Sequence, residues 1–460
     1  MPSEVGQEGR YERFILMYVK DDTDSIVRVT ARPESVPDDP REWSWVEASV
    51  WTDRMLAALG NGVRGGKWHS VIDKVYAPKT LRAAWRRVAA NRGAAGIDRM
   101  SIERFEVNAE HYLKVLGHEL RNGSYTPEPI RRVYIPKGKG KTRPLGIATV
   151  KDRIVQGALK LVIEPIFEKE FLPVSFGFRP QRSCKDALRV VERSLKDGFT
   201  WVVDADLQNY FDTIPKQRLL ELVKAKVSDV NALKLLQQFL DQEVIEGMKH
   251  WTPVAGTPQG SVISPLLANL YLHGLDEILC DGEYKYARFA DDFVVMCRTR
   301  EEAEKVLVVI QDWVNKHGLT LHPEKTRIGH CAVKGQGFDF LGYRFDAGRR
   351  WVRPKSRKAL RDKIRALTGR TRSGSLDSII MELNPILRGW FGYFKHAHRS
   401  TFRDVDGFVR RRLRALLRKR EKRPGFGRTA RDHRRWPNAF FAQHRLFTLQ
   451  EAFVVASQPQ

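Results

Sequence analysis

The chain has 460 residues, 42% of them hydrophobic, and a formal net charge of +25. It is too apolar to be disordered, and its length suits two or three domains with cores of their own. It has no apolar stretch of 18 residues and no basic-then-apolar N-terminal signal, so we expect a cytoplasmic protein with no membrane partner.

The positive charge is concentrated toward the C-terminus. Residues 346–460 hold 29 Lys and Arg against 9 Asp and Glu, a net of +20 out of the chain's +25. A whole basic domain with interleaved aromatic residues is more typical of polyanion binding than of a solvated face. The cysteines show no C-x-x-C spacing, which favours reduced thiols over a zinc knuckle or a disulfide framework. They are Cys184, Cys280, Cys297 and Cys331.

In chain order, the sequence divides into an N-terminal extension of unreadable role, a helical part, a mixed part, a basic helical domain and a basic segment. These span residues 1–40, 41–125, 126–345, 346–420 and 421–460. In the helical part, "LRAAWRRVAAN" (81–91) has helical apolar spacing and ends at a Gly-rich stretch. "SIERFEVNAEHYLKVLGHELRNG" (101–123) predicts helix from Ser101 to a Gly stop.

Acidic residues follow two strand patterns in the mixed part. "FTWVVDADLQNYFDTIP" (199–215) is a strand that ends in Asp204 and Asp206. "YKYARFADDFVVMC" (284–297) predicts a hairpin with Asp291 and Asp292 at its turn. If the strand ends adjoin, Asp206 and the turn acids converge, and divalent cations are needed to offset their repulsion.

Two Mg²⁺ ions held by such carboxylates are the usual device for in-line phosphoryl transfer, so we predict two Mg²⁺ ions here. For the Asp-Asp pair alone, an ordinary acidic turn remains the alternative.

Two loops support the metal interpretation. "VAGTPQGSVISPLLANLYL" (254–272) opens a long apolar helix, and its Gly256 and Gly260 allow close approach of a ligand to the backbone. "VYIPKGKGKTRPLGI" (133–147) is a basic hairpin that can aim Lys137 and Arg143 at one triphosphate, although such turns are most often merely solvated.

The order of these blocks resembles the reverse transcriptases encoded by bacterial group II introns, from about Trp43 to near the C-terminus. The resemblance also rests on "NRGAAGID" (91–98), "SFGFRPQRSCKDAL" (175–188), "LTLHPEKTRI" (319–328), "FDFLGYRF" (338–345), "ILRGWFGYFKHA" (386–397) and "RRWPNAFFAQHRLFTLQEAF" (434–453). It implies an α+β right-hand polymerase, with fingers and a palm containing antiparallel sheet. An α-helical thumb or maturase domain and a basic DNA-binding segment would follow.

The resemblance also implies roles for individual residues. Asp206, Asp291 and Asp292 match the catalytic, metal-binding carboxylates, with Asp204 as the rival of Asp206. Phe211 matches the steric gate against a 2′-hydroxyl. The other nucleotide-binding candidates are Lys137, Arg143, Gln259, Gly260 and Lys325, and Lys325 is also a candidate general acid. Phe289 stands where the family usually has Tyr, so we expect altered rate or fidelity rather than loss of activity.

The basic C-terminal part contains the helical pattern "FRDVDGFVRRRLRALLRKR" (402–420). Its apolar stripe predicts core packing, and its arginines are candidates for contact with a nucleic-acid backbone. These arginines are Arg410, Arg411, Arg414, Arg418 and Arg420. An upstream helix, "LDSIIMEL" (376–383), is expected to stop at Asn384-Pro385.

The function implied is an RNA-directed DNA polymerase that also assists splicing of its group II intron RNA and copies that RNA during retrohoming. Its partners would be intron RNA, an RNA template with a DNA primer, a DNA target and dNTPs, near the bacterial nucleoid. All four cysteines precede residue 332, so we expect no Cys- and His-rich endonuclease domain. The alternatives are a host-adopted reverse transcriptase in repair or defence, a non-catalytic RNA-binding splicing factor, and a metal-dependent nuclease.

Overall fold

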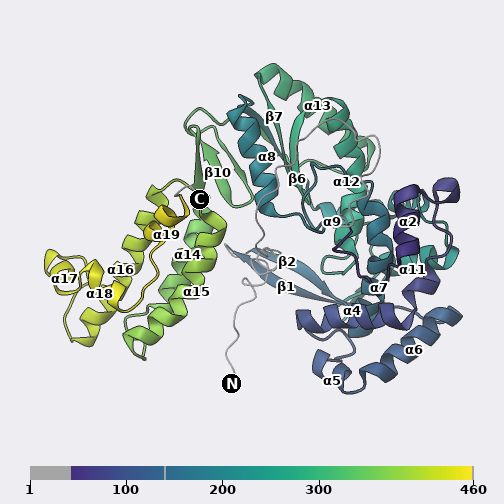
Figure 1. The fold of residues 1–460 in the computed structure, drawn as a ribbon, viewed down its shortest axis with the longest axis horizontal. Coiled ribbons are helices and arrows are strands. Elements are labelled where there is room, and N and C mark those ends of the chain that lie inside the picture. The colour runs from purple at the N-terminus through teal and green to yellow at the C-terminus, as the bar shows by residue number, and fades with distance from the viewer. Residues whose placement is uncertain (1–42, 139–140, 458–460) are drawn as a thin grey trace. The chain divides into compact units, whose positions relative to one another are not determined.

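The computed structural model describes residues 43–138 and 141–457, so the predicted extension over residues 1–40 lies outside the described part. The chain forms two compact units. The first unit runs to Phe199 and continues over Ala205–Arg327, and the second holds Thr200–Asp204 and Ile328–Gln460. The elements are labelled in Figure 1.

The first unit begins with the predicted helical part. Its elements are α2 (Asp53–Asn61), the 3-10 helix η1 (Arg64–Gly66), α3 (Ile72–Val75), α4 (Pro78–Asn91), α5 (Ile102–Val107) and α6 (Ala109–Asn122). Helix α4 ends as predicted, with Arg92 in the left-handed conformation after Asn91. The pattern after Ser101 forms two helices rather than one, because Asn108 leaves helical geometry at φ −125° and ψ 29°.

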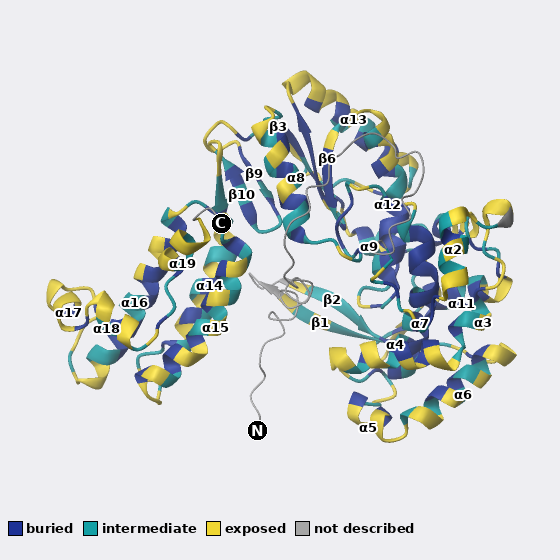
Figure 2. Cartoon of the chain, viewed as in Figure 1, coloured by how far each residue is buried: buried dark blue, intermediate teal, exposed yellow. Residues whose placement is uncertain are grey.

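Helix α7 (Val150–Glu168) lies at the centre of this unit, and Figure 2 shows it buried along most of its length. The side chains of Ile154, Val155 and Ala158 are fully buried. Fourteen of its 19 residues are buried, so it belongs to the core rather than to the surface. It packs against α4, which places the N-terminal helices around it.

A four-stranded sheet in the same unit has the order β2-β1-β4-β5. Its strands are β1 (Ile130–Gly138), β2 (Lys141–Ile147), β4 (Val244–Glu246) and β5 (Lys249–Trp251). Strands β1 and β2 form the predicted basic hairpin, with Ile135 opposite Arg143 (Figure 1). The β1–β4 pair is parallel and joins this hairpin to a part of the chain more than 100 residues away.

A second four-stranded sheet has the order β6-β7-β3-β8. Its strands are β3 (Trp201–Asp206), β6 (Lys285–Phe289), β7 (Asp292–Cys297) and β8 (Arg327–His330). The apolar strand before Asp206 and the hairpin that carries the paired aspartates are therefore both confirmed. The remaining helices of the first unit are α8 (Cys184–Lys196), α9 (Tyr210–Thr213), α10 (Lys216–Lys224), α11 (Val230–Leu240), α12 (Ser264–Asp281) and α13 (Arg300–Lys316).

The second unit combines an antiparallel sheet of order β11-β10-β9 with helices. The elements are β9 (Phe338–Phe340), β10 (Tyr343–Asp346), β11 (Arg349–Val352), α14 (Pro354–Leu367), α15 (Leu376–Phe394), α16 (Ser400–Arg420), α17 (Ala430–Arg435), α18 (Asn438–Gln443) and α19 (Leu449–Ala456). Together the two units give the predicted α+β class with a helical C-terminal region.

The expected helix stop at Pro385 is wrong, because α15 continues through it to Phe394. Proline inside a helix costs about 3 kcal/mol or more, mainly through a lost hydrogen bond and a clash. The buried stripe continues past it at Leu387, Phe391 and Phe394, and each such side chain contributes about 1.5–3 kcal/mol on burial. Tertiary packing therefore outweighs the local signal.

No helix among the described residues combines the length and the apolar character needed to cross a membrane. The cysteines are thiols rather than disulfides, as predicted.

Candidate active site and nucleic-acid surface

Asp206 is the last residue of β3, and its carboxylate is about half exposed. Its backbone is tied to the segment after α13, since His322 N–H donates to the Asp206 carbonyl at 2.7 Å. In the same segment, Lys325 Nζ donates to Asp206 Oδ1 at 2.8 Å. The structure thus places Lys325 on the predicted catalytic carboxylate, where it neutralises part of the charge.

Asp291 lies in the two-residue turn between β6 and β7, where Phe289 pairs with Asp292. Burial raises the pKa of the Asp291 carboxyl, and the negative charge of Asp206 raises that pKa further. A carboxylate that raises the pKa of another lies within electrostatic reach of it. The predicted convergence of the strand end and the hairpin turn is therefore present for Asp206 and Asp291.

Two cations oppose this rise. Arg143 and Lys325 both lower the pKa of Asp291 through their positive charges. Arg143 belongs to β2 and Lys325 follows α13, so elements far apart in sequence meet at the paired acids. Asp292 begins β7 beside them and is exposed.

A loop of residues 255–260, which we call the Gly-Gln loop, borders this site. Gly256 N–H donates to the Ile214 carbonyl at 2.8 Å, and Thr257 N–H donates to the Phe211 carbonyl at 2.7 Å. A Cβ on Gly256 would lie 2.7 Å from the Phe211 carbonyl oxygen, so only glycine fits this approach. The loop therefore rests directly on α9, which carries the predicted gate residue Phe211.

The same loop contacts β2. Gly146 N–H donates to the Gln259 carbonyl at 2.7 Å. Gly260 has φ +104°, and a Cβ there would lie 2.3 Å from the Gly146 oxygen. The side chain of Gln259 donates through Nε2 to Asp212 Oδ2 at 3.1 Å. The structure thus brings together Phe211, Gln259 and Gly260, three of the predicted nucleotide-binding candidates.

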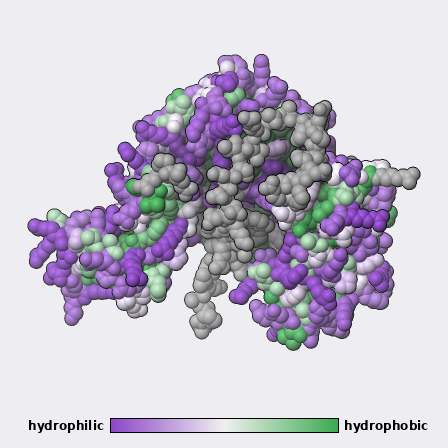
Figure 3. Space-filling view, viewed as in Figure 1, coloured by the Kyte–Doolittle hydropathy of each residue, from purple (hydrophilic) through white to green (hydrophobic). Residues whose placement is uncertain are grey.

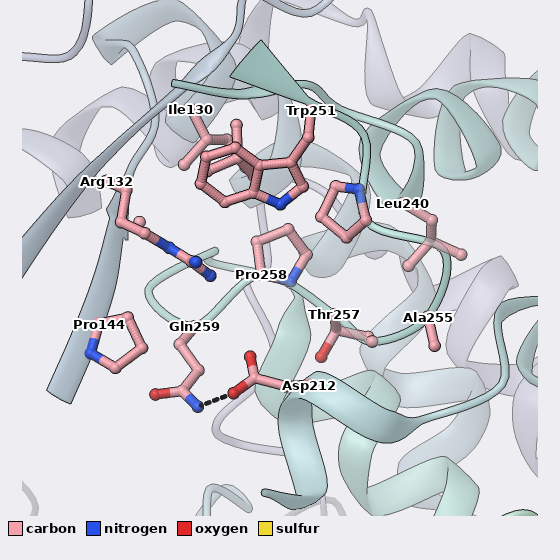
Figure 4. A pocket seen from close by; sticks show the side chains of 14 residues that line it. Ile130, Arg132, Pro144, Asp212, Leu240, Trp251, Ala255, Thr257, Pro258 and Gln259 are labelled. Carbon is pink, nitrogen blue, oxygen red and sulfur yellow. Dashed lines mark hydrogen bonds between the residues drawn. The ribbon is translucent and has the colours of Figure 1, made fainter. Parts of the chain in front are cut away.

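A cavity of about 110 Å³ opens between this loop and the β2-β1-β4-β5 sheet. Figure 4 shows Arg132 and Trp251 on its sheet side and Gln259 bonded to Asp212 opposite them. The Arg132 guanidinium lies 5.0 Å from the centre of the Trp251 ring. The Thr257 hydroxyl is buried without a hydrogen-bond partner among the described residues. The cavity wall thus offers both stacking and polar groups.

Sequence reasoning missed Asp212 and Arg132. Burial raises the pKa of Asp212, while the charges of Arg132 and Arg143 oppose that rise. The sequence did hold a signal for Asp212, because this residue directly follows the gate candidate Phe211. Lys137 was predicted to bind the triphosphate, but its side chain lies outside the described part of the chain.

The C-terminal arginines divide into internal and surface groups. Arg414 is only 2% exposed, and its guanidinium donates to the Trp436 carbonyl and to Asn438 Oδ1. Arg418 bonds to Asp432 and to the Pro424 carbonyl. These partners join α16 to the chain after it. The prediction that Arg414 contacts nucleic acid is therefore corrected, since its guanidinium is buried and already paired.

A basic surface on α14 and α16 includes Arg411, which was predicted from the sequence, and Arg361 and Arg365, which were not. The guanidinium groups of Arg361, Arg365 and Arg411 lie 5.4, 5.5 and 5.1 Å from the centre of the Phe408 ring. Burial lowers the pKa of Arg411, and the positive charges of Arg428, Arg365 and Arg361 lower it further. Such crowding of like charges favours a polyanion that would relieve it.

We call Arg361, Arg365 and Arg411 the Phe408 arginine cluster. The sequence signal for this cluster was a pair of arginines four residues apart on α14, namely Arg361 and Arg365. In Figure 3, hydrophilic residues cover most of the visible face of the C-terminal helices, with apolar patches between them. Arg410 and Arg420 lie on the same helix as Arg411, and Arg420 donates to the Gly374 carbonyl at 2.6 Å.

The acids of the active site have the donor chemistry for a hard divalent cation. Among the described residues, no three His, Cys, Asp or Glu side chains already form a metal-binding cluster. The charge of Asp206 nevertheless raises the pKa of Asp291, an effect that a cation between the two carboxylates would oppose. Their oxygen donors fit Mg²⁺ rather than a soft metal.

Comparison with known proteins gives two family matches. The family described as "Reverse transcriptase (RNA-dependent DNA polymerase)" matches residues 135–345. The family described as "Group II intron, maturase-specific domain" matches residues 357–436. The first match contains the paired acids and the Gly-Gln loop, and the second contains the Phe408 arginine cluster.

Individual proteins are similar to this chain. "Protein YkfC" of Escherichia coli is 34% identical over 58% of this chain and 80% of its own length. "Group II intron-encoded protein LtrA" of Lactococcus lactis is 34% identical over 56% of this chain, and the match spans 40% of LtrA. A telomerase structure from Candida albicans covers 69% of this chain and 64% of that chain, at TM-score 0.40 and 11% identity. The chain belongs to the family of group II intron-encoded reverse transcriptases.

Proposed function

We propose that this chain copies RNA into DNA at the site formed by Asp206, Asp291 and Asp292, and that it also assists the splicing and mobility of a group II intron. The observation that carries the proposal is the placement of Asp206, Arg143 and Lys325 around Asp291, with Lys325 Nζ bonded to Asp206 Oδ1 at 2.8 Å. Three chain segments converge there, as nucleotidyl transfer requires.

The residues of the site have separate tasks in this proposal. Arg143, with Lys137 from the same hairpin, binds the triphosphate of the incoming nucleotide. The ring of Phe211 lies under the sugar and excludes a 2′-hydroxyl. Gln259 and Gly260 contact the nucleotide or the template from the Gly-Gln loop. Lys325 supplies a positive charge, and in its protonated form it can donate a proton toward the leaving pyrophosphate.

Asp206, Asp291 and Asp292 would hold two Mg²⁺ ions. When bound, such ions lower the pKa of an attacking hydroxyl and stabilise charge on the leaving oxygen. The turn residues provide these ligands from a fixed hairpin, which limits the reorganisation needed during the reaction.

The second unit would bind RNA. The Phe408 arginine cluster lies within the region matched by the maturase family and places three guanidiniums around one ring. Phosphate groups can pair with such guanidiniums through charge-assisted hydrogen bonds. The partners proposed are the intron RNA, a primed RNA template and a DNA target.

Metal removal tests the catalytic part of this proposal. Purified protein is given a DNA primer annealed to RNA, dNTPs and MgCl₂, and single-nucleotide extension is followed before and after chelation. We expect extension to stop with chelator and to return when excess Mg²⁺ is added. Equal extension in the presence of chelator would refute metal-assisted transfer.

A further inference from the structure

The chain contains a fully buried ion pair beneath the turn that carries the paired acids. Arg288 and Asp276 are both 0% exposed. Arg288 Nε donates to Asp276 Oδ1 at 2.7 Å, and its second amino group donates to Asp276 Oδ2. Tyr286 also donates to Asp276 Oδ1, at 2.8 Å. No role described so far uses this pair.

The remaining amino group of Arg288 reaches the turn itself. Arg288 Nη1 donates to the Ala290 carbonyl at 3.1 Å and to Asn269 Oδ1 at 2.9 Å. Asp276 and Asn269 both belong to α12, whereas Ala290 directly precedes Asp291. One planar guanidinium thus connects a core helix to the backbone of the turn, through donors whose directions are fixed.

The turn needs such support because its backbone is strained. Ala290 has φ +59°, a left-handed conformation that residues with a Cβ rarely adopt. Glycine is the usual residue at a hairpin position with positive φ. A conformation of this kind persists only when its surroundings hold it in place. The neighbouring Gly177 contributes, since a Cβ there would lie 2.3 Å from Ala290 N.

Asn269 extends the support to this neighbour, because its Nδ2 donates to the Gly177 carbonyl at 2.7 Å. The backbone of Arg288 is held on the same side, where Phe176 N–H donates to its carbonyl at 2.8 Å. The buried network therefore contacts the turn through one carbonyl and also fixes the segment packed against it.

Stability alone does not account for a buried ion pair, because desolvation of both charges offsets much of their attraction. We propose that Arg288 and Asp276 are positioning residues for nucleotidyl transfer. They fix the carbonyl of Ala290 and thereby the orientation of the Asp291 and Asp292 carboxylates. This inference rests on the proposed function of those two acids.

The test compares two changes at this pair. Arg288→Lys keeps the charge but loses the planar fork, and the double change Arg288→Met with Asp276→Leu removes both charges without leaving one unpaired. We expect each variant to lower the single-nucleotide kcat of the folded protein at least about tenfold at saturating dNTP and Mg²⁺. Primer–template affinity should change less than threefold.

Hydrogen–deuterium exchange provides a readout that does not depend on activity. The peptide spanning residues 285–297 should exchange faster in both variants, most of all at the turn. Arg414→Lys is the matched control, because Arg414 is likewise buried and its guanidinium donates to the Trp436 carbonyl and to Asn438 Oδ1 in the second unit. It should lose thermal stability while its kcat stays within threefold of the parent.

The outcomes are distinguishable. If the parent extends primers and both Arg288 variants keep kcat within threefold, the positioning role is overturned while the proposed function stands. An equal kcat loss in Arg414→Lys would also overturn it, since the effect would then be general destabilisation. If the parent itself does not extend primers, the proposed function fails first.

Discussion

At the scale of one residue, Asp291 shows that a group proposed for function can lower the stability of the fold. Its pKa is raised by burial and by Asp206, so the ionised carboxylate opposes folding at neutral pH. A protein tolerates such a group where its charge has a use. Lys325 and Arg143 reduce this cost in the structure, and a bound cation would reduce it further.

Phe211 is the residue whose change should alter substrate choice. Phe211→Val removes the ring proposed to lie under the sugar, so ribonucleotides should be admitted. We expect discrimination between dCTP and CTP, measured as the ratio of kcat/KM values, to fall at least about tenfold, which corresponds to roughly 1.4 kcal/mol. Use of dCTP should fall less than discrimination does. Unchanged discrimination would assign the gate to another side chain and reopen the choice between Asp204 and Asp206.

The paired acids were visible in the sequence because two adjacent aspartates interrupt an apolar run. Arg414 was assigned to the wrong role and Arg288 was not assigned a role, because the partners of both residues come together only in the tertiary fold. Arg414 follows the basic pattern of its helix, yet its guanidinium bonds to the chain 22 and 24 residues later. A charge pattern alone cannot distinguish a surface arginine from one that joins two segments.

At the scale of elements, α7 connects the interior to the Gly-Gln loop. Gln156 accepts hydrogen bonds from the Ser261 hydroxyl at 2.8 Å and from Val262 N–H at 2.9 Å. On the same helix, Asp152 accepts from the Tyr125 hydroxyl at 2.5 Å and from Gln242 Nε2 at 3.2 Å. The two bonds of Gln156 fix the chain at the end of the loop to this core helix.

Asp152 predicts a pH dependence of stability. Burial is the largest influence and raises its pKa to about 6. Between about pH 4 and pH 6 the folded state therefore binds more protons than the unfolded state, so stability from this residue falls as pH rises. Relative to Asp152→Asn, the parent should lose up to about 3 kcal/mol across this interval.

The measurement is urea unfolding of both proteins at pH 4.5, 5.5 and 6.5, with the difference in unfolding free energy compared. Common effects of other carboxyl groups cancel in this difference. A difference that stays constant with pH, or that changes in the parent's favour as pH rises, would contradict the raised pKa.

Elements with strong local signals were predictable. The two hairpins and the long helix after the Gly-Gln loop follow directly from apolar runs bounded by glycine and proline. Local signals failed where a distant contact decided the outcome, as at Pro385, where packing of the second half of α15 maintains the helix. The prediction of one continuous helix after Ser101 failed at Asn108 for another reason, because asparagine is only a weak helix-stop signal.

At the scale of the whole molecule, the acids proposed as catalytic and the arginines proposed to bind RNA belong to different compact units. The proposed RNA binding therefore predicts a salt-dependent affinity that the acids do not control. Removing the Phe408 arginine cluster by Arg361→Ala, Arg365→Ala and Arg411→Ala should weaken intron RNA binding about tenfold or more. The slope of log K against log salt should fall by about 2 if each arginine contacts a phosphate.

The matched control removes the same amount of charge elsewhere. Arg82, Arg189 and Arg300 are exposed and paired with acids in the first unit, so their triple alanine variant has the same net charge. Filter binding across a salt series compares the two. Equal losses in both variants would show that net charge, rather than the cluster, determines affinity.

The central claim is that one chain polymerises DNA with its paired acids and binds RNA through a separate surface. The most direct measurement pairs two assays on parent and Asp291→Asn, namely single-nucleotide extension on an RNA template and equilibrium binding of intron RNA. Because Asn keeps the shape but not the charge, we expect extension to fall at least about 10²- to 10³-fold. RNA affinity should stay within threefold and the Tm at pH 7 should not decrease. Extension near the parent rate would contradict the assignment of the active site, and a parallel loss of RNA binding would contradict the separation of the two functions.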